Sequence, residues 1–213
     1  MKKQNRTIIL ASRSPRRRQL FKRLGVSFRV VEPRAEEVSP RRTSAPGALV
    51  MRNALTKARW VSSRFPDAVI IGADTIVFQK GRVFGKPGSL RAAHRMLLTL
   101  KRAPHWVYTG VALIDTKRAI SIADYEKTKV YFRDISDKAV ERYFTVTSPL
   151  DKAGGYAIQE NGDLLIRRIE GDFFNVVGLP LVRVDELLMG VLNAGCGNSK
   201  KRRRYGAGLD HRR

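Results

Sequence analysis

The chain has 213 residues, 43% of them hydrophobic, and a formal net charge of +23. This length and apolar fraction suffice for one core, divided into two lobes around a cleft, and no apolar run approaches the roughly 20 residues that a membrane-spanning helix requires. The single cysteine, Cys196, excludes an internal disulfide and suits a reducing compartment, and the three histidines lack the spacing of a zinc site. We therefore expect a cytoplasmic protein without a membrane segment, in which any metal is a hard one bound by carboxylates.

The positive charge is shared between the body of the chain and its C-terminal end. Residues 200–213 contain seven Lys and Arg and one Asp, a net +6, which leaves +17 for residues 1–199. Such a charge implies anionic partners: nucleotides, nucleic acid or a membrane surface. We expect residues 1–197 to form one domain of two lobes. Residues 198–213 are expected to be a basic, disordered tail, useful for nucleic-acid contact or simply for solubility.

Strand and helix signals alternate along the chain, which predicts an α/β fold. The apolar run 7–11 reads as a buried strand, and a helix follows from Pro15, with Ser14 as its N-cap and Gly25 closing it. The arginines at 16–18 then fall in the first turn, where the helix dipole makes each cation unfavourable by roughly 0.3–1 kcal/mol. An anion bound at the helix start would remove this conflict, although a solvated basic turn explains the same pattern.

The remaining elements continue this alternation. We expect strands at 28–31, 69–73, 76–78, 82–84, 106–115 and 119–133. A turn at 79–81 makes a hairpin. We expect helices at 47–63, from Ser89 to 100, and from Ser136 to about 144. For the C-terminal part we expect strands at 156–158, 164–169 and 173–177 and a closing helix at 179–192.

Two acidic features are candidates for chemistry. Asp74 directly follows the apolar run 69–73, so it is expected at the carboxyl end of a buried strand, where open α/β sheets bind ligands. Its carboxylate could hold a divalent cation, orient a water or accept its proton, and a turn aspartate that bonds its own backbone is the alternative. Glu36 and Glu37 could supply a metal partner or merely neutralise the arginines around them.

Three further positions suit a phosphorylated or nucleotide ligand. Lys57 lies on the apolar stripe of its helix and should point inward, past small neighbours or toward a buried anion. Lys86 sits in a rigid Gly-Lys-Pro loop, which suits a phosphate contact as well as a surface turn. Segment 151–159 combines a glycine pair with Gln159, whose carboxamide can both donate and accept, as reading the edge of a nucleobase requires.

In order and spacing these segments resemble the Maf family of nucleotide pyrophosphatases. The matching blocks are LASRSPRR at 10–17, IGADT at 71–75, GKP at 85–87, DKAGGYAIQ at 151–159 and NVVGLPL at 175–181. The resemblance covers about residues 7–192. It implies a Maf/ITPase-like α/β fold, with a twisted mixed sheet and flanking helices in two lobes around a central cleft, often as a homodimer. It also implies hydrolysis of a nucleoside triphosphate to the monophosphate and pyrophosphate with a divalent cation, Mg or Mn.

The resemblance also implies roles for individual residues. Asp74 matches the catalytic carboxylate and proton acceptor, and it matches a metal ligand together with Glu37. The groups matching those around the phosphates and metal include Ser12, Arg16, Arg17, Lys57 and Lys86. Those that set substrate preference are Arg16, Thr75 and Gln159, and they look like the branch acting on dTTP and UTP rather than on 7-methyl-GTP. The family is further associated with house-cleaning of non-standard nucleotides and with arrest of septum formation.

Departures from the family pattern keep other readings open. Glu160 stands where glycine usually follows Ile-Gln, which places a carboxylate near the expected base pocket and leaves a modified purine triphosphate as an alternative substrate. The loop 33–46 is rich in arginine and lacks much of the usual acidic pattern. Arg13 and Arg18 are expected only to add to the general positive charge. A nucleic-acid-binding or cell-division regulatory protein on the same fold is the alternative function that this charge supports.

Overall fold

The computed structural model describes residues 6–193, so Cys196 and the predicted tail at 198–213 lie outside the described residues. The strands are β1 (Ile8–Ala11), β2 (Arg29–Val31), β3 (Val69–Gln79), β4 (Arg82–Phe84), β5 (His105–Asp115), β6 (Ile120–Phe132) and β7 (Ile166–Glu170). The helices are α1 (Pro15–Lys22), α2 (Pro46–Ser62), α3 (Leu90–Leu100), α4 (Asp137–Val146), α5 (Phe173–Val177) and α6 (Leu181–Asn193), with 3-10 turns η1 (Ala153–Gly155) and η2 (Gly162–Leu164). Among the described residues, no helix is long and apolar enough to cross a membrane.

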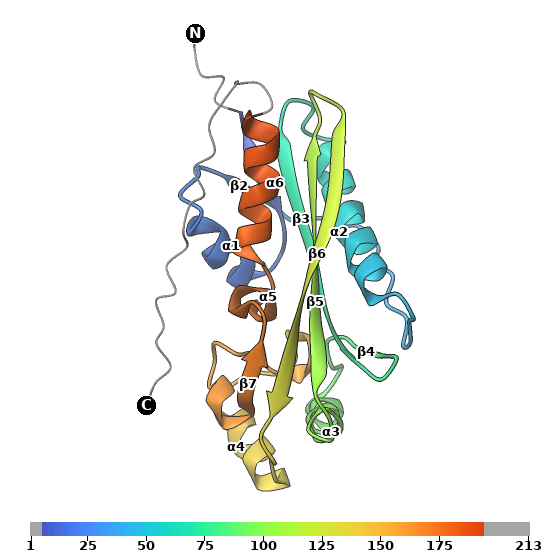
Figure 1. Ribbon diagram of the computed structural model, residues 1–213, viewed down its shortest axis with the longest axis vertical. Helices are drawn as coiled ribbons and strands as arrows, with labels where there is room; N and C mark the ends of the chain where they lie inside the picture. Colours follow the sequence, from blue (N-terminus) through green and yellow to red (C-terminus); the bar gives the residue numbers. More distant parts are fainter. Residues whose placement is uncertain (1–5, 194–213) are drawn as a thin grey trace.

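The strands form one mixed sheet in the order β2-β1-β3-β5-β6-β7, and β4 pairs with β3 beside this path. The short strand β1 runs parallel to both of its neighbours, β2 and β3. The pairings of β3 with β4 and β5, of β5 with β6, and of β6 with β7 are antiparallel. The long strands β5 and β6 twist strongly along their length (Figure 1). The predicted α/β fold with a twisted mixed sheet is confirmed.

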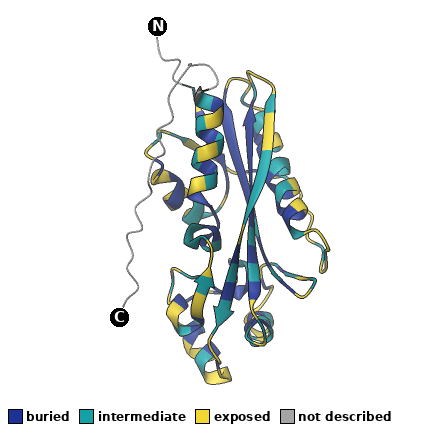
Figure 2. Cartoon of the chain, viewed as in Figure 1, coloured by how far each residue is buried: buried dark blue, intermediate teal, exposed yellow. Residues whose placement is uncertain are grey.

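Helices flank the sheet and divide its core into two lobes (Figure 1). In the lobe that holds β1, the helices α1, α5 and α6 lie on one side of the sheet and α2 on the other. Separate clusters of buried apolar side chains fill these two layers. A further cluster joins α3 and α4 to the far ends of β3, β5 and β6 in the second lobe. Figure 2 shows that the central strands are among the most deeply buried parts of the chain.

Two glycines let α2 approach the sheet closely. A Cβ atom at Gly72 of β3 would lie 2.3 Å from the carbonyl oxygen of Ala54, and one at Gly110 of β5 would lie 2.3 Å from that of Val50. A side chain at either position would therefore push the helix away from the close-packed sheet. The contact brings the inward face of α2 against the middle of β3, where Asp74 pairs with Gly110.

Local signals for helix starts and for one hairpin are confirmed. The side-chain oxygens of Ser14, Ser89 and Ser136 each accept a hydrogen bond from the backbone N–H three residues later, as N-cap residues do. Lys80 and Gly81 have positive φ angles of 47° and 79° and join β3 to β4. These features depend on neighbours in the sequence, and for that reason the sequence predicts them well.

Two of the strands predicted in the C-terminal part are wrong. Residues 173–177 form the helix α5, which Asp172 caps by accepting a hydrogen bond from the backbone N–H of Phe174 at 2.8 Å. A five-residue, mostly apolar run suits a buried helix as well as a strand, and periodicity does not separate the two. Residues 156–158 are irregular, because the preceding Gly154 and Gly155 have φ angles of 72° and 78° that turn the chain away from an extended path.

Replacement of Gly110 by alanine should lower the free energy of unfolding by roughly 1–3 kcal/mol, since the new methyl group would meet backbone atoms of α2 rather than a flexible side chain. Gly88→Ala is the matched control, because a Cβ there meets nothing within 4 Å, and it should change stability by less than about 0.5 kcal/mol. Urea unfolding followed by circular dichroism measures both. Equal midpoints for the two variants would contradict the role of Gly110.

Candidate active site

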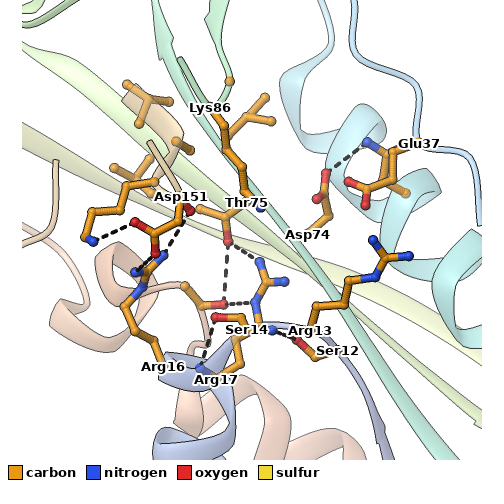
Figure 3. A pocket seen from close by; sticks show the side chains of 18 of the residues that line it. Ser12, Arg13, Ser14, Arg16, Arg17, Glu37, Asp74, Thr75, Lys86 and Asp151 are labelled. Carbon is orange, nitrogen blue, oxygen red and sulfur yellow. Dashed lines mark hydrogen bonds and ion pairs between the residues drawn. The ribbon is translucent and has the colours of Figure 1, made fainter. Parts of the chain in front are cut away.

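A cavity of about 580 Å³ lies where the loop after β1, the start of α1, the middle of β3 and the segment 151–159 meet. All the residues singled out from the sequence as site residues line it: Ser12, Arg16, Arg17, Glu37, Lys57, Asp74, Thr75, Lys86 and Gln159. Figure 3 shows that the labelled side chains among them come from several elements and converge on one space. The fold therefore brings together groups that lie far apart along the chain.

The prediction that Asp74 lies at the carboxyl end of a strand is wrong, because β3 continues beyond it to Gln79. The neighbouring strand β1 does end here: its last residue, Ala11, pairs with Gly72. Beyond that point the edge of β3 is no longer covered by β1, while on the other side Asp74 still pairs with Gly110 of β5. The site thus opens at the carboxyl end of β1, the kind of position expected for a ligand in an open α/β sheet.

Two side chains of α2 hold the Asp74 carboxylate. Lys57 donates from Nζ to Oδ1 at 2.7 Å, and Asn53 donates from Nδ2 to Oδ2 at 2.9 Å. Asn53 and Lys57 are four residues apart, so they lie on the same face of the helix. All three residues are at most 7% exposed. The prediction that Lys57 points inward is confirmed, and its partner is a buried anion.

Glu37 joins this group from the loop before α2. Its Oε2 lies 2.9 Å from Lys57 Nζ, so one ammonium group bridges two carboxylates. Asn53 also holds the loop, because it accepts a hydrogen bond from the backbone N–H of Val38 at 3.0 Å and donates to the Val38 carbonyl at 2.9 Å. Of the two adjacent glutamates it is Glu37, not Glu36, that lines the cavity.

The charge state of Asp74 follows from these contacts. Burial raises the pKa of its carboxyl group, but the Lys57 ammonium, the Arg17 guanidinium and the Asn53 amide together lower it by more, so the pKa lies below its ordinary value. Asp74 is therefore ionised at neutral pH. A buried carboxylate without such partners would be strongly disfavoured, so the ion pair with Lys57 is a condition for placing this charge inside the protein.

Arg17 reaches from the first turn of α1 to the sheet. Its guanidinium donates to the Gly178 carbonyl at 2.7 Å, to the Ala73 carbonyl at 2.9 Å and to the Thr75 hydroxyl at 2.8 Å. Burial lowers its pKa. Oxygen atoms of the protein thus surround a cation that the helix dipole alone would disfavour. A guanidinium has five N–H donors, so donors remain for a ligand in the cavity.

Two hydroxyl groups on the cavity wall also have protein partners. The Thr75 hydroxyl lies 2.9 Å from that of Thr109, in addition to its bond from Arg17. Ser12 Oγ accepts a hydrogen bond from the backbone N–H of Ser14 at 3.1 Å, which bends the loop between β1 and α1. Both hydroxyls therefore help to fix the shape of the wall.

Three members of the predicted set are exposed: Lys86, Gln159 and Glu37, of which Glu37 is already paired with Lys57. Lys86 extends from the loop after β4 toward the part of the cavity that holds Thr75 (Figure 3). Gln159 lines the cavity from the segment 151–159. An exposed ammonium group and an exposed carboxamide at a cavity are free to move onto a bound molecule, unlike the buried Lys57.

Arg16 belongs to a second group of charges, on another wall of the cavity (Figure 3). Its NH1 lies 2.7 Å from Asp151 Oδ2 and 3.8 Å from Glu160 Oε1. The nearly buried ammonium of Lys152 lies 2.8 Å from Asp151 Oδ1 and 3.0 Å from Glu160 Oε2. Two cations and two carboxylates thus alternate in a ring, which we call the Arg16 cluster. It joins α1 to the segment 151–160.

Sequence reasoning missed three residues that line the cavity. Asn53 orients Asp74, and its spacing of four residues from Lys57 was the signal that could have identified it. Arg13, predicted only to add to the general charge, also lines the cavity and donates to the Pro33 carbonyl at 3.1 Å. Lys152 lies in a segment that the sequence singled out, but its burial depends on tertiary contacts that no local pattern reveals.

Asp74 and Glu37 fit a magnesium or manganese ion by their donor chemistry. Their carboxylates lie 2.7 and 2.9 Å from the same Lys57 nitrogen, which shows that they can approach one cation together. Hard divalent cations prefer such oxygens and often use one or two protein carboxylates together with substrate phosphates. The described part of the chain contains no group of three or more His, Cys, Asp or Glu that would form an all-protein site.

Comparison with solved structures supports the fold. A HAM1 protein from Coxiella burnetii has a TM-score of 0.52 with this chain at 12% sequence identity, and the match covers 89% of this chain and 99% of that protein. At this identity the likeness concerns the arrangement of the elements and not the chemistry of the cavity.

Comparison of sequences gives closer relatives. A protein of Moorella thermoacetica named dTTP/UTP pyrophosphatase is 49% identical over 181 residues, 85% of this chain and 93% of its own length. A protein of Dictyoglomus thermophilum with the same name is 44% identical over 181 residues, 85% of this chain and 94% of its own length. The family model described as Maf-like protein matches residues 7–191, a range that contains every cavity residue discussed above. This chain belongs to the Maf family.

Proposed function

We propose that this protein hydrolyses dTTP and UTP to the corresponding monophosphate and pyrophosphate. The observation that carries the proposal is the buried, ionised Asp74, held by Lys57 and Asn53 in a cavity otherwise rich in cations. The relatives from Moorella thermoacetica and Dictyoglomus thermophilum, both named dTTP/UTP pyrophosphatase, support the same activity.

The charge balance of the cavity favours a polyanionic substrate. Three carboxylates line it, and they are outnumbered by six cations: Arg13, Arg16, Arg17, Lys57, Lys86 and Lys152. A triphosphate would complete this balance, since cations arranged in advance around the transferring phosphoryl group stabilise the charge that develops there. Lys86 is the exposed cation best able to move onto the phosphates, whereas Arg17 is already fixed by its bonds to the sheet.

Asp74 has the position and charge for a general base. In the proposed reaction a water oxygen attacks the α-phosphorus, the bond from that phosphorus to the bridging oxygen breaks, and pyrophosphate leaves with the bond's electron pair. The proton of the water passes to a carboxylate oxygen of Asp74. Asn53 and Lys57 keep that carboxylate oriented. A divalent ion held by Asp74 and Glu37 would supply charge stabilisation on the phosphoryl oxygens.

The preference for pyrimidine triphosphates is assigned to Arg16, Thr75 and Gln159. Arg16 and Gln159 present polar groups on cavity walls, and Thr75 fixes the guanidinium of Arg17. Divalent-metal dependence, a house-cleaning role in nucleotide metabolism, a homodimeric state and an effect on septum formation remain predictions for this protein. So does contact of the basic tail with nucleic acid.

A panel of nucleoside triphosphates assayed for pyrophosphate release with Mg²⁺ or Mn²⁺ tests the activity directly. We expect dTTP and UTP to be the best substrates, because the relatives that share most of this chain carry that name, and we expect chelation of the metal to abolish turnover. If no triphosphate is turned over, the proposed function is wrong. A clear preference for a purine would contradict the assignment of Arg16, Thr75 and Gln159.

Asp74→Asn should lower kcat/KM by on the order of 10²–10³, because the amide can neither accept the proton nor carry the charge. The substitution preserves the shape of the side chain, so circular dichroism should show a folded protein. Asp163→Asn, on an exposed turn, is the matched control and should leave kcat/KM unchanged. Full activity of the Asp74 variant would remove this residue from the mechanism.

The pH profile of kcat/KM tests the coupling of Lys57 to Asp74. Because Lys57 lowers the pKa of Asp74 and burial raises it, Lys57→Met should move the acid limb of the profile to higher pH, whatever the loss of overall rate. The wild-type acid limb should lie below the ordinary range for an aspartate. An acid limb at the same pH in both proteins would show that Asp74 does not control it.

A further inference from the structure

We propose that Glu160 weakens the attraction of this cavity for its anionic substrate, because its carboxylate neutralises one positive charge of the Arg16 cluster. Glu160 is thus a positioning residue that sets affinity. The inference rests on the proposed function, because it takes a nucleoside triphosphate as the ligand. Glu160 does not line the cavity, whereas Arg16, Asp151 and Lys152 all do. It therefore acts on the ligand through the two cations that it contacts.

Within the Arg16 cluster, the shortest contact of Glu160 is with Lys152. Its Oε2 lies 3.0 Å from Lys152 Nζ, and its Oε1 lies 3.8 Å from Arg16 NH1. The Lys152 side chain is only 5% exposed and also donates to the Ser148 carbonyl at 2.8 Å and to Asp151 at 2.8 Å. Glu160 thus completes the set of oxygens around a buried ammonium group.

The number of charges in the cluster decides the sign of the effect. With Glu160 the cluster has two cations and two carboxylates and no net charge. Without that carboxylate the same wall would present one net positive charge to the cavity. A triphosphate would then bind more tightly, and the gain would be larger for a ligand of higher negative charge. The effect is limited, since the Glu160 side chain is 41% exposed and solvent screens it.

The backbone at Glu160 is held independently of its side chain. Thr147 donates from its hydroxyl to the Glu160 carbonyl at 3.1 Å, and Asn161 donates to the same hydroxyl at 3.2 Å. Asn161 has a left-handed φ of 54° that sets the turn. A change of the side chain alone should therefore leave the path of the loop intact, so that an altered affinity reports on charge.

Binding of the α,β-methylene analogue of UTP, which resists cleavage at the proposed bond, tests the inference by calorimetry alongside steady-state kinetics with UTP. Glu160→Gln should lower Kd for the analogue and KM for UTP by roughly two- to fivefold, the range of an exposed charge pair, with kcat within twofold of wild type. The change in Kd for UMP should be smaller, because UMP has fewer charges. Added salt should reduce the difference between variant and wild type.

Two controls separate charge from structure. Glu160→Asp keeps the negative charge and should stay within twofold of the wild-type Kd. Glu141→Gln removes the same charge from an exposed position of α4 and should change nothing. The inference is overturned if Glu160→Gln behaves like Glu141→Gln, if kcat falls together with affinity, or if UMP gains as much as the triphosphate analogue. Absence of turnover and binding in the wild-type protein would instead refute the proposed function.

Discussion

The buried ion pair between Lys57 and Asp74 is the interaction on which the site depends. A carboxylate at 6% exposure in the middle of a sheet is costly unless a cation meets it there. Lys57 can do so because Gly72 and Gly110 allow α2 to lie directly against β3 and β5. The chemistry of the cavity therefore depends directly on the packing of α2 against the sheet. The same helix face supplies Asn53, which orients Asp74 and holds the loop that carries Glu37.

The arginines of the first helical turn illustrate how a local misfit is resolved by distant partners. Nothing acidic lies in the first turn of α1, so the helix dipole opposes these cations. Arg17 finds oxygen atoms on β3 and on the residue that follows α5, and Arg16 finds Asp151. The protein itself thus supplies a carboxylate for Arg16 and neutral oxygen acceptors for Arg17. A bound anion need only complete the set.

The two walls of the cavity differ in their balance of cations and carboxylates. Around Asp74 one cation, Lys57, bridges two carboxylates, which suits recruitment of a divalent ion. On the wall of the Arg16 cluster, two carboxylates offset two cations, so that wall holds its arginine in place without adding net charge. Lys86, in contrast, is exposed and reaches into the cavity (Figure 3). Such a division suits an elongated ligand with a highly charged end and a less charged end.

The amino-acid sequence by itself determined the features that rest on near neighbours: the three serine caps, the hairpin at Lys80 and Gly81, the alternation of strands and helices, and the motif blocks that identify the family. Tertiary structure decided what depends on long-range contacts. Asp74 lies inside β3 rather than at its end, because β3 stays paired with β5 as far as Phe78. The point at which the neighbouring strand β1 stops is visible only in the register of the two strands. Residues 173–177 form a helix, which the sequence could not predict because a short apolar run is compatible with either a helix or a strand. The partners of Arg17, Lys152 and Glu160 likewise come from distant segments, and a pattern of single residues cannot specify which charges meet in space.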